Sequence, residues 1–310
     1  MRDNRKVLMI HQMDLAGSPY RMEYAINHFL DGWEARRVQK VETFQMGFPR
    51  GLTWSNLGEL SEQADIVHIH HIYFSQQVIP QLSGNPKIVV SVRGSPDREK
   101  KTPVPKEVDF LHSCHWDLLG TYPQATVIPN FILTKDIEPY GPSGPEEITQ
   151  PNRIKVFQPV AHKLKHPEEF EKVKAATSRQ ADFISQEGKH CKVKNSDQLE
   201  NMSKCHISWD NLQHNFGNNS IEALALGLLP ITSLGKDTVE GLCGFFNVFL
   251  DSLPYHFHGG SDEISKSLIE LSKDPEGLLS LRKQAHQFWR ERWMDKHIIQ
   301  KWGDIYGGLL

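Results

Sequence analysis

Residues 214–232, HNFGNNSIEALALGLLPIT, have the residue types that bind a phosphate group beside a sugar hydroxyl. The sequence GNNS (217–220) stands directly before an apolar helical segment. Gly permits a close backbone approach, and Asn and Ser cap helices. The N-terminus of that helix would offer free N–H groups and a positive dipole to a diphosphate. Glu222 in the first turn would accept hydrogen bonds from vicinal hydroxyls such as those of ribose. The alternative is a capped core helix whose Glu222 complements the dipole.

Histidines form a second group in residues 65–71, DIVHIHH. In a strand, His68 and His70 share one face and His71 lies on the other. The HxH spacing can bind zinc, but no closed set of four ligands is visible, so the sequence predicts no metal. The four cysteines form no CxxC pair, which favours reduced thiols in a cytoplasmic protein. No Ser-His-Asp or Cys-His pattern has a recognisable local context.

Short apolar runs alternate with helix-length segments along the first half of the chain, and this alternation is typical of a parallel sheet covered on both faces. The sequence predicts strands at 6–11, 38–44, 65–71, 87–93 and 125–129, with a helix over 20–30. Pro, Gly, Ser and acidic residues then concentrate in 139–151, which indicates a linker.

The alternation restarts after this segment. It predicts strands at 154–161, 182–185, 206–209, 229–233 and 246–250, helices at 168–176 and 220–226, and a mostly helical stretch over 261–306. The expected fold is α/β, with two Rossmann-like doubly wound domains. We expect domains at 1–140 and 153–294, a linker at 141–152, and a C-terminal helix at 295–310 that is a candidate to join the first domain. Ligands would bind in the cleft between the domains.

Composition excludes several classes of protein. The chain has 310 residues, a formal net charge of −3 and 38% hydrophobic residues, so a packed core is expected rather than disorder or a fibre. No apolar run approaches the ~20 residues that span a bilayer, and no secretory signal is expected. The charge does not favour a nucleic-acid binder, and the basic excess in 153–204 indicates a solvated surface.

The segment FGNNSIEALALGLLPITS (216–233) resembles the C-terminal donor-site motif of GT-B glycosyltransferases, especially of glycosyltransferase family 4. That motif runs Glu, seven residues, Glu, then Ala and a Gly-x-Pro turn. Other segments resemble the family in the same order along the chain: HQMDLAGSP (11–19), ADIVHIHHIY (64–73), VVSVRGSPD (89–97) and VIPNFI (127–132). Their collinear order carries the resemblance over most of the chain.

The resemblance implies a GT-B fold of two facing Rossmann-like domains with a cleft between them. It also implies transfer of a sugar from a nucleotide diphosphate sugar, here expected to be a UDP-sugar, with retention and without an essential metal or other cofactor. The implied donor-binding residues are Gly17, Ser18, His162, Lys163, Lys165, Phe216, Gly217, Asn218, Asn219, Ser220 and Glu222. The implied catalytic residues are Arg93, His214 and Lys165.

The chain departs from the family pattern at two points. His214 stands where the motif has its first Glu, so a sugar hydroxyl would meet an imidazole there. The family's Arg and Lys pair corresponds to His162-Lys163-Leu164-Lys165, in which Lys165 matches the Lys. Lys163 and Lys165 would therefore neutralise the diphosphate without a guanidinium.

On the acceptor side, the resemblance implies His70, His71 and Arg93. Arg93 ends a predicted strand and would bind a phosphate or an acidic acceptor. The alternative is a structural ion pair with Asp97. Gly17 and Ser18 would place backbone N–H groups near the donor phosphates or the acceptor, or would form an ordinary tight turn.

The acceptor itself stays open between a saccharide and a hydroxymethylated DNA base, as in viral GT-B enzymes. A non-catalytic nucleotide- or glycan-binding protein is the alternative of another class. The sequence indicates no protein partner. Residues 281–302 mix Trp with basic residues and are interpreted as a packed C-terminal helix rather than a membrane-docking one.

Overall fold

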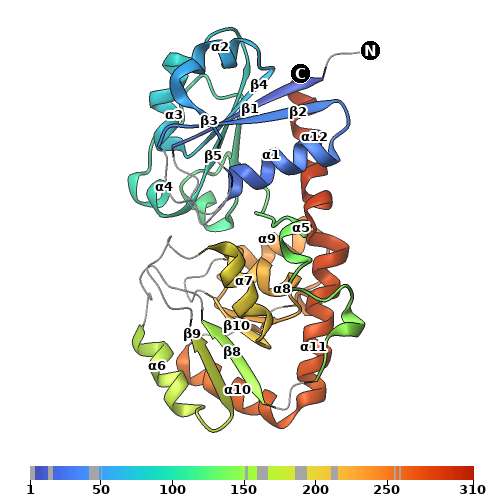
Figure 1. The fold of residues 1–310 in the computed structure, drawn as a ribbon. Coiled ribbons are helices and arrows are strands. Elements are labelled where there is room, and N and C mark those ends of the chain that lie inside the picture. Colours follow the sequence, from blue (N-terminus) through green and yellow to red (C-terminus); the bar gives the residue numbers. More distant parts are fainter. Residues whose placement is uncertain are drawn as a thin grey trace. The chain divides into compact units, whose positions relative to one another are not determined.

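The computed structural model describes residues 4–12, 17–41, 49, 51–150, 153–158, 167–185, 194–210, 216–254, 256–257 and 260–310. The chain forms two compact units, each with one parallel sheet and flanking helices (Figure 1). Unit 1 comprises Met1–Phe131 and Asp295–Leu310, and unit 2 comprises Ile132–Met294. The segment 141–150, expected as part of a linker, lies in unit 2, where Ile148 is buried.

Unit 1 contains a sheet of seven strands in the order β3-β2-β1-β4-β5-β6-β7. Its strands are β1 (Arg5–His11), β2 (Trp33–Gln39), β3 (Leu52–Thr53), β4 (Ile66–His70), β5 (Lys87–Val92), β6 (Phe110–Ser113) and β7 (Thr126–Val127). Its helices are α1 (Ser18–Phe29), η2 (Trp54–Asn56), α2 (Leu57–Glu62), α3 (Ile72–Val78), η3 (Ile79–Gln81), α4 (Gly94–Lys100), η4 (Trp116–Gly120) and α12 (Asp295–Leu309). All strand pairs are parallel.

The two faces of this sheet differ in polarity because successive side chains point to opposite faces. On one face, Val67 and Ile69 of β4 join an apolar cluster with Phe74 and Val78 of α3. The other face, which α1 and α12 cover, receives His68 and His70 of β4. The strand order reverses between β1 and β4, so the switch point at which doubly wound sheets bind ligands lies at the ends of these two strands.

Unit 2 contains a sheet of five strands in the order β12-β11-β10-β8-β9, again all parallel. Its strands are β8 (Ile154–Gln158), β9 (Ala181–Ser185), β10 (Ile207–Trp209), β11 (Leu229–Thr232) and β12 (His256–Phe257). Its helices are α5 (Thr134–Ile137), η5 (Pro145–Glu147), α6 (Pro167–Ala176), α7 (Asn195–Ser203), α8 (Asn218–Ala225), α9 (Lys236–Phe246), η6 (Leu250–Ser252), α10 (Ser261–Lys273), α11 (Pro275–Phe288) and the π-helical turn η7 (Trp289–Trp293). The switch point of this sheet lies between β8 and β10.

The predicted α/β fold of two doubly wound domains is confirmed. Two predicted strands differ from the structure. The strand expected at 38–44 lies earlier, as β2 (Trp33–Gln39), so only 38 and 39 belong to it, and 42–44 lie outside the described residues. The strand expected at 246–250 is wrong, because that segment ends α9, turns at Asn247 with φ 52° and enters η6. An apolar run of this length fits a helix end as well as a strand, and periodicity does not separate the two. No helix in the described parts of the chain combines the length and the apolar character needed to cross a membrane.

The end of α8 is fixed by Gly227, whose φ of 69° lies in the left-handed region. A Cβ at this position would lie 2.7 Å from Cδ1 of Ile148. Arg282 of α11 is buried, and its guanidinium donates to the carbonyls of Gly227 (2.8 Å) and Thr149 (2.9 Å). These contacts fix where α8 ends and β11 begins.

We expect G227A to lower the free energy of unfolding by about 1–3 kcal/mol, because alanine would have to adopt the positive φ and its Cβ would clash with the Ile148 side chain. Urea denaturation of the purified chain measures the change. Gly244 in α9 is the matched control, since a Cβ there meets no atom within 4 Å. G244A should be neutral or slightly stabilising, and equal losses in the two variants would contradict the explanation.

Candidate functional site

The switch point of sheet 1 carries two buried histidines. The pairing of Ile10 with Ile69 puts His11 of β1 and His70 of β4 next to each other at the carboxyl ends of their strands. Both side chains are almost fully buried, and neither ring has a hydrogen-bond partner among the described residues. Since buried polar groups are normally satisfied, two such rings at a switch point mark this edge as a candidate ligand site.

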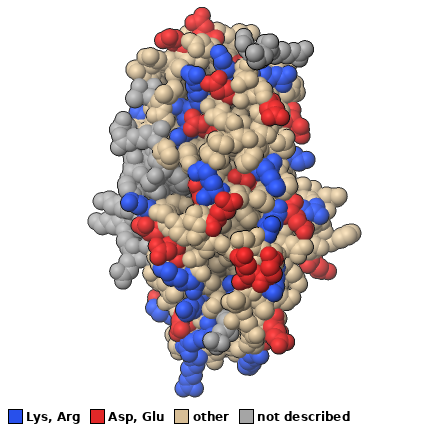
Figure 2. All heavy atoms as spheres, turned by 45° about the vertical axis from the view of Figure 1, so that its right-hand side comes forward, with Lys and Arg blue, Asp and Glu red and all other residues tan. Residues whose placement is uncertain are grey.

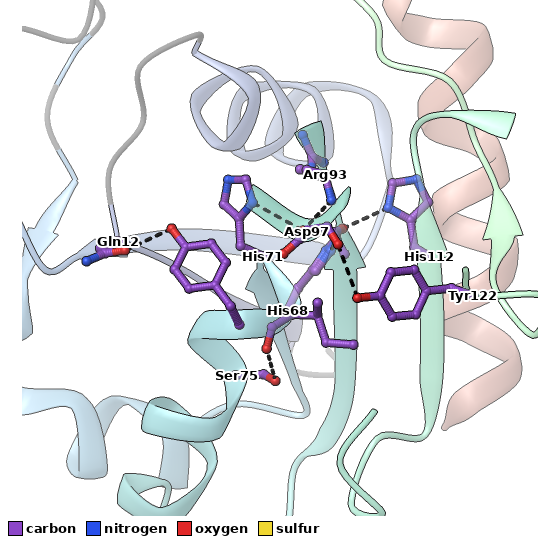
Figure 3. Close-up of polar contacts among 11 residues, drawn as sticks. Gln12, His68, His71, Ser75, Arg93, Asp97, His112 and Tyr122 are labelled. Carbon is purple, nitrogen blue, oxygen red and sulfur yellow. Dashed lines mark hydrogen bonds and ion pairs between the residues drawn. The ribbon is translucent and has the colours of Figure 1, made fainter. Parts of the chain in front are cut away.

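Next to them, a chain of hydrogen bonds crosses the interior of unit 1, and two of its members, His68 and His112, are labelled in Figure 3. Nε2 of His112 lies 2.9 Å from the Ile128 carbonyl, which can only accept, so this nitrogen carries the proton. Nδ1 of His112 therefore accepts from the Ser91 hydroxyl (2.7 Å), which in turn accepts from Nε2 of His68 (2.6 Å). Nδ1 of His68 then accepts from the Tyr306 hydroxyl of α12 (2.7 Å). The chain is complete only when both imidazoles are neutral.

Burial keeps these histidines uncharged. Desolvation holds the pKa of His68, His70 and His112 well below the usual 6.5, and the positive charge of Arg93 lowers all three further. The pKa of His11 falls to about 3 through burial, with smaller contributions from Arg37, His71 and Arg93. The site therefore presents neutral imidazoles near pH 7.

Arg93 follows β5 at the same edge of the sheet. Its backbone N–H donates to Oδ2 of Asp97 (2.5 Å), and Nδ1 of His71 lies 3.3 Å from the same oxygen (Figure 3). The Arg93 guanidinium instead reaches Oδ1 of Asn130 (3.4 Å) and the sulfur of Met22 (3.8 Å). The alternative of an Arg93–Asp97 side-chain ion pair is therefore wrong.

His71 joins β4 to α3 with φ 78° and ψ 121°, a left-handed conformation that costs a non-glycine residue about 1–3 kcal/mol. Its side chain is 24% exposed and contacts the fully buried Asp97. Strain of this kind persists where the surrounding structure imposes it, and it gathers at binding sites. The structure thus brings three predicted acceptor-side residues, His70, His71 and Arg93, to one edge of sheet 1.

The start of α1 lines a small pocket in unit 1 together with Arg93. Gly17 is its N-cap with φ 70°, and Ser18 is its first residue. Ser18, Arg21, Arg93 and Asn130 together line a small pocket in unit 1. The left-handed φ explains the glycine, because other residues adopt this conformation at a cost.

In unit 2, the predicted phosphate-binding turn does begin a helix at the carboxyl edge of its sheet. Gly217 is the N-cap of α8, and residues 217–219 are partly exposed. Asp210, directly after β10, accepts from the Ser220 amide (3.1 Å) and from the Ser220 hydroxyl. One helix-tip amide is therefore already bound, and a carboxylate sits against the tip. The amides of Asn218 and Asn219 have no acceptor inside the helix.

Glu222 is 2% exposed and is held by a neighbouring helix. The amide nitrogen of Gln198 in α7 donates to Oε2 of Glu222 (3.0 Å) and to Oδ1 of Asn219 (2.9 Å). Phe216 stacks on Trp293 with ring centroids 5.0 Å apart, which positions the turn before α8. The structure thus brings together Phe216, Gly217, Asn218, Asn219, Ser220 and Glu222.

Four predicted site residues, His162, Lys163, Lys165 and His214, lie outside the described residues. The sequence reasoning missed Asp210, Gln198, Ser91 and Tyr306. For Asp210 a signal existed, because an acidic residue closes the predicted strand 206–209 ahead of a glycine turn. For the others no local signal existed, since their partners lie on other elements.

In the described residues, metal ligands, thiols and surface charge add no further candidate site. Within the described ranges, no group of three or more His, Cys, Asp or Glu side chains could hold a metal ion. Cys114, Cys205 and Cys243 are free thiols. The face drawn in Figure 2 mixes positive and negative side chains rather than gathering a basic patch.

No family model and no curated protein matches the sequence. Solved structures do match over almost the whole chain. An alpha-glucosyltransferase in complex with UDP and a 13-mer DNA is 14% identical, with a TM-score of 0.69, over 99% of this chain and 100% of its own. Sucrose-phosphate synthase from Thermosynechococcus elongatus is 13% identical, with a TM-score of 0.66, over 99% of each chain. HepE from Anabaena in complex with UDP is 11% identical, with a TM-score of 0.61, over 98% of this chain and 100% of its own.

At these identities the likeness establishes the fold. The chain has the GT-B fold, as the motif order predicted. Membership of glycosyltransferase family 4 stays a prediction.

We expect Y306F to lower the free energy of unfolding by about 1–3 kcal/mol, because Nδ1 of His68 would be left as a buried acceptor without its donor. Urea denaturation measures the effect. Y140F removes a hydroxyl from a half-buried tyrosine and should change stability by less than about 0.5 kcal/mol. A Y306F value as small as that of Y140F would contradict the hydrogen-bond chain.

We also expect stability to fall as the pH is lowered from 7 towards 4.5. The unfolded chain protonates its histidines near pH 6.5, whereas the folded chain keeps His11, His68, His70 and His112 neutral to lower pH. Each histidine contributes up to about 1.4 kcal/mol per pH unit in this window. Denaturant titrations at several pH values give the slope. In H70Q the slope of the free energy of unfolding against pH should decrease by about 1.4 kcal/mol per pH unit, which corresponds to one proton. An unchanged slope would show that His70 does not contribute.

Proposed function

We propose that this chain is a glycosyltransferase that moves a sugar from a nucleotide diphosphate sugar, specifically a UDP-sugar, to a hydroxyl of its acceptor. The observation that carries the proposal is the start of α8. Its first amides have no acceptor within the helix and lie at the carboxyl edge of sheet 2, in a chain whose structural neighbours include proteins in complex with UDP. A helix N-terminus in this place suits the diphosphate.

Unit 2 would bind the donor. The carboxylate of Glu222, oriented by Gln198, would accept hydrogen bonds from the ribose hydroxyls. The amides of Asn218 and Asn219 would contact the diphosphate. Because Asp210 already places a negative charge at the helix tip, cations must balance the diphosphate, and Lys163 and Lys165 are the proposed source. His214 would contact a hydroxyl of the donor sugar.

Unit 1 would bind the acceptor through His70, His71 and Arg93, with Gly17 and Ser18 at the start of α1. We propose that the sugar is transferred with retention. The bond from the anomeric carbon to the leaving phosphate oxygen breaks as the acceptor oxygen bonds to that carbon, and the leaving oxygen takes the acceptor proton. Lys165 would stabilise the developing phosphate charge, so the reaction needs no metal.

A hydroxymethylated DNA base is the second candidate acceptor, and one observation favours it: a structural neighbour is in complex with UDP and DNA. The mixed charge of the face in Figure 2 and the net charge of −3 favour a small acceptor instead. A non-catalytic nucleotide-binding protein would bind UDP without turnover.

The test is a thermal-shift screen with UDP, GDP, ADP and TDP, followed by calorimetry and by UDP release from UDP-sugars. We expect UDP to bind. E222Q should weaken binding about tenfold or more, because it replaces a charge-assisted hydrogen bond to ribose. E240Q on the exposed side of α9 is the matched control and should bind UDP like the unmodified chain.

Three results would count against parts of this proposal. Equal UDP affinity in E222Q and E240Q would remove Glu222 from the donor site. Tight binding without UDP release from any donor would favour the binding protein. A product of inverted anomeric configuration, read by NMR, would exclude retention.

A further inference from the structure

Arg93 is a buried cation, and no carboxylate among the described residues forms an ion pair with its guanidinium. The residue is 8% exposed, and its Nε has no acceptor among the described residues. Its two terminal nitrogens reach an amide oxygen, that of Asn130, and a thioether, that of Met22, both at long range. The buried carboxylate of Asp97 lies nearby but is bound to the Arg93 backbone and to His71 instead.

A guanidinium in this setting is costly. Removing a charge from water without a counter-charge is strongly unfavourable, and buried charges are normally paired with an opposite charge. The field of Arg93 is evident in its surroundings, because it contributes to lowering the pKa of His11, His70 and His112. Those rings are neutral, so they do not cancel or add to the positive charge.

Further donors of hydrogen bonds converge on the same place. Arg93 lines a pocket together with Ser18, Arg21 and Asn130. Ser18 begins the 12-residue helix α1, which has no acidic residue in its first turn and no side-chain cap on its N-terminus. The positive end of this helix and the Arg93 guanidinium therefore face one pocket, and both favour a negative ligand.

We propose that this pocket binds the phosphate group of a small phosphorylated acceptor, such as a sugar phosphate. The role as acceptor rests on the proposed glycosyltransferase function, whereas the phosphate binding does not. The bidentate fork of Arg93 would hold two phosphate oxygens, and the Ser18 amide and Arg21 would reach a third.

The burial of Arg93 favours a compact terminal phosphate over a nucleic-acid backbone. Phosphates of a duplex are contacted by exposed Lys and Arg side chains spread along a surface. Here the cation lies below the surface and lines a small pocket, a setting that suits one terminal phosphate group better than a line of backbone phosphates.

The experiment measures binding of glucose 6-phosphate, inorganic phosphate, glucose and a duplex oligonucleotide to the full chain, by thermal shift and calorimetry. We expect glucose 6-phosphate and inorganic phosphate to bind and glucose to bind far more weakly. R93Q should weaken glucose 6-phosphate binding about tenfold to a hundredfold, and R93K less, since lysine keeps the charge but loses the fork. UDP binding should persist in both variants.

R36Q is the matched control, because Arg36 is 58% exposed and pairs with Glu34 at the surface of β2. It should bind every ligand like the unmodified chain. If R93Q does not fold, R93K carries the test. Equal glucose 6-phosphate affinity in R93K, R36Q and the unmodified chain would overturn the proposal.

Loss of UDP binding together with phosphate binding would also overturn it, by assigning Arg93 to the donor. Binding of the oligonucleotide through Arg93 would replace the small acceptor with DNA, and binding of inorganic phosphate without glucose 6-phosphate would remove the acceptor role. If UDP does not bind at all while glucose 6-phosphate binds through Arg93, the proposed function fails and the phosphate site stands.

Discussion

The hydrogen bond from Tyr306 to His68 fixes the last helix of the chain against a sheet built from residues 5–127. Three neighbouring strands place His68, Ser91 and His112 on the face that α12 covers, where unpaired polar atoms would be costly. Their hydrogen bonds close only in one direction, from Tyr306 to the Ile128 carbonyl. Trp302 packs beside them, with its ring centroid 4.5 Å from that of His112. The position of α12 along the sheet is therefore fixed by hydrogen bonds as well as by apolar packing.

Burial in the same interior of unit 1 determines which side chains of the candidate acceptor site are charged. Because burial keeps the histidines neutral, the local charge depends on the arginines and on Asp97 rather than on pH near 7. Arg93 then acts as a constant positive charge at the end of β5. Its neutral neighbours provide hydrogen bonds that suit hydroxyl groups as well as phosphate oxygens.

The start of α8 in unit 2 carries the opposite local charge, that of a carboxylate. Asp210 binds the Ser220 amide and brings a carboxylate to a helix end that would otherwise attract anions. Gln198 and Phe216 hold the neighbouring residues in place through α7 and Trp293. A diphosphate at this position needs cations as well as amides, whereas an anion at the Arg93 pocket meets a cation that is already there.

The sequence by itself determined the local features. Runs of Val and Ile predicted β1, β4 and β5 to within one residue, because strands of a parallel sheet are buried on both faces. The GNNS turn predicted the start of α8 to within two residues, although Gly217 is its N-cap and the Asn residues lie inside the helix. The same reasoning failed at 246–250, where an apolar run ends a helix. Only the tertiary structure decided that Asp97 pairs with His71 rather than with the Arg93 guanidinium, that Asp210 binds the tip of α8, and that Tyr306 meets His68 across 238 positions. These contacts depend on how separate elements pack, and residue spacing along the chain carries no record of that packing.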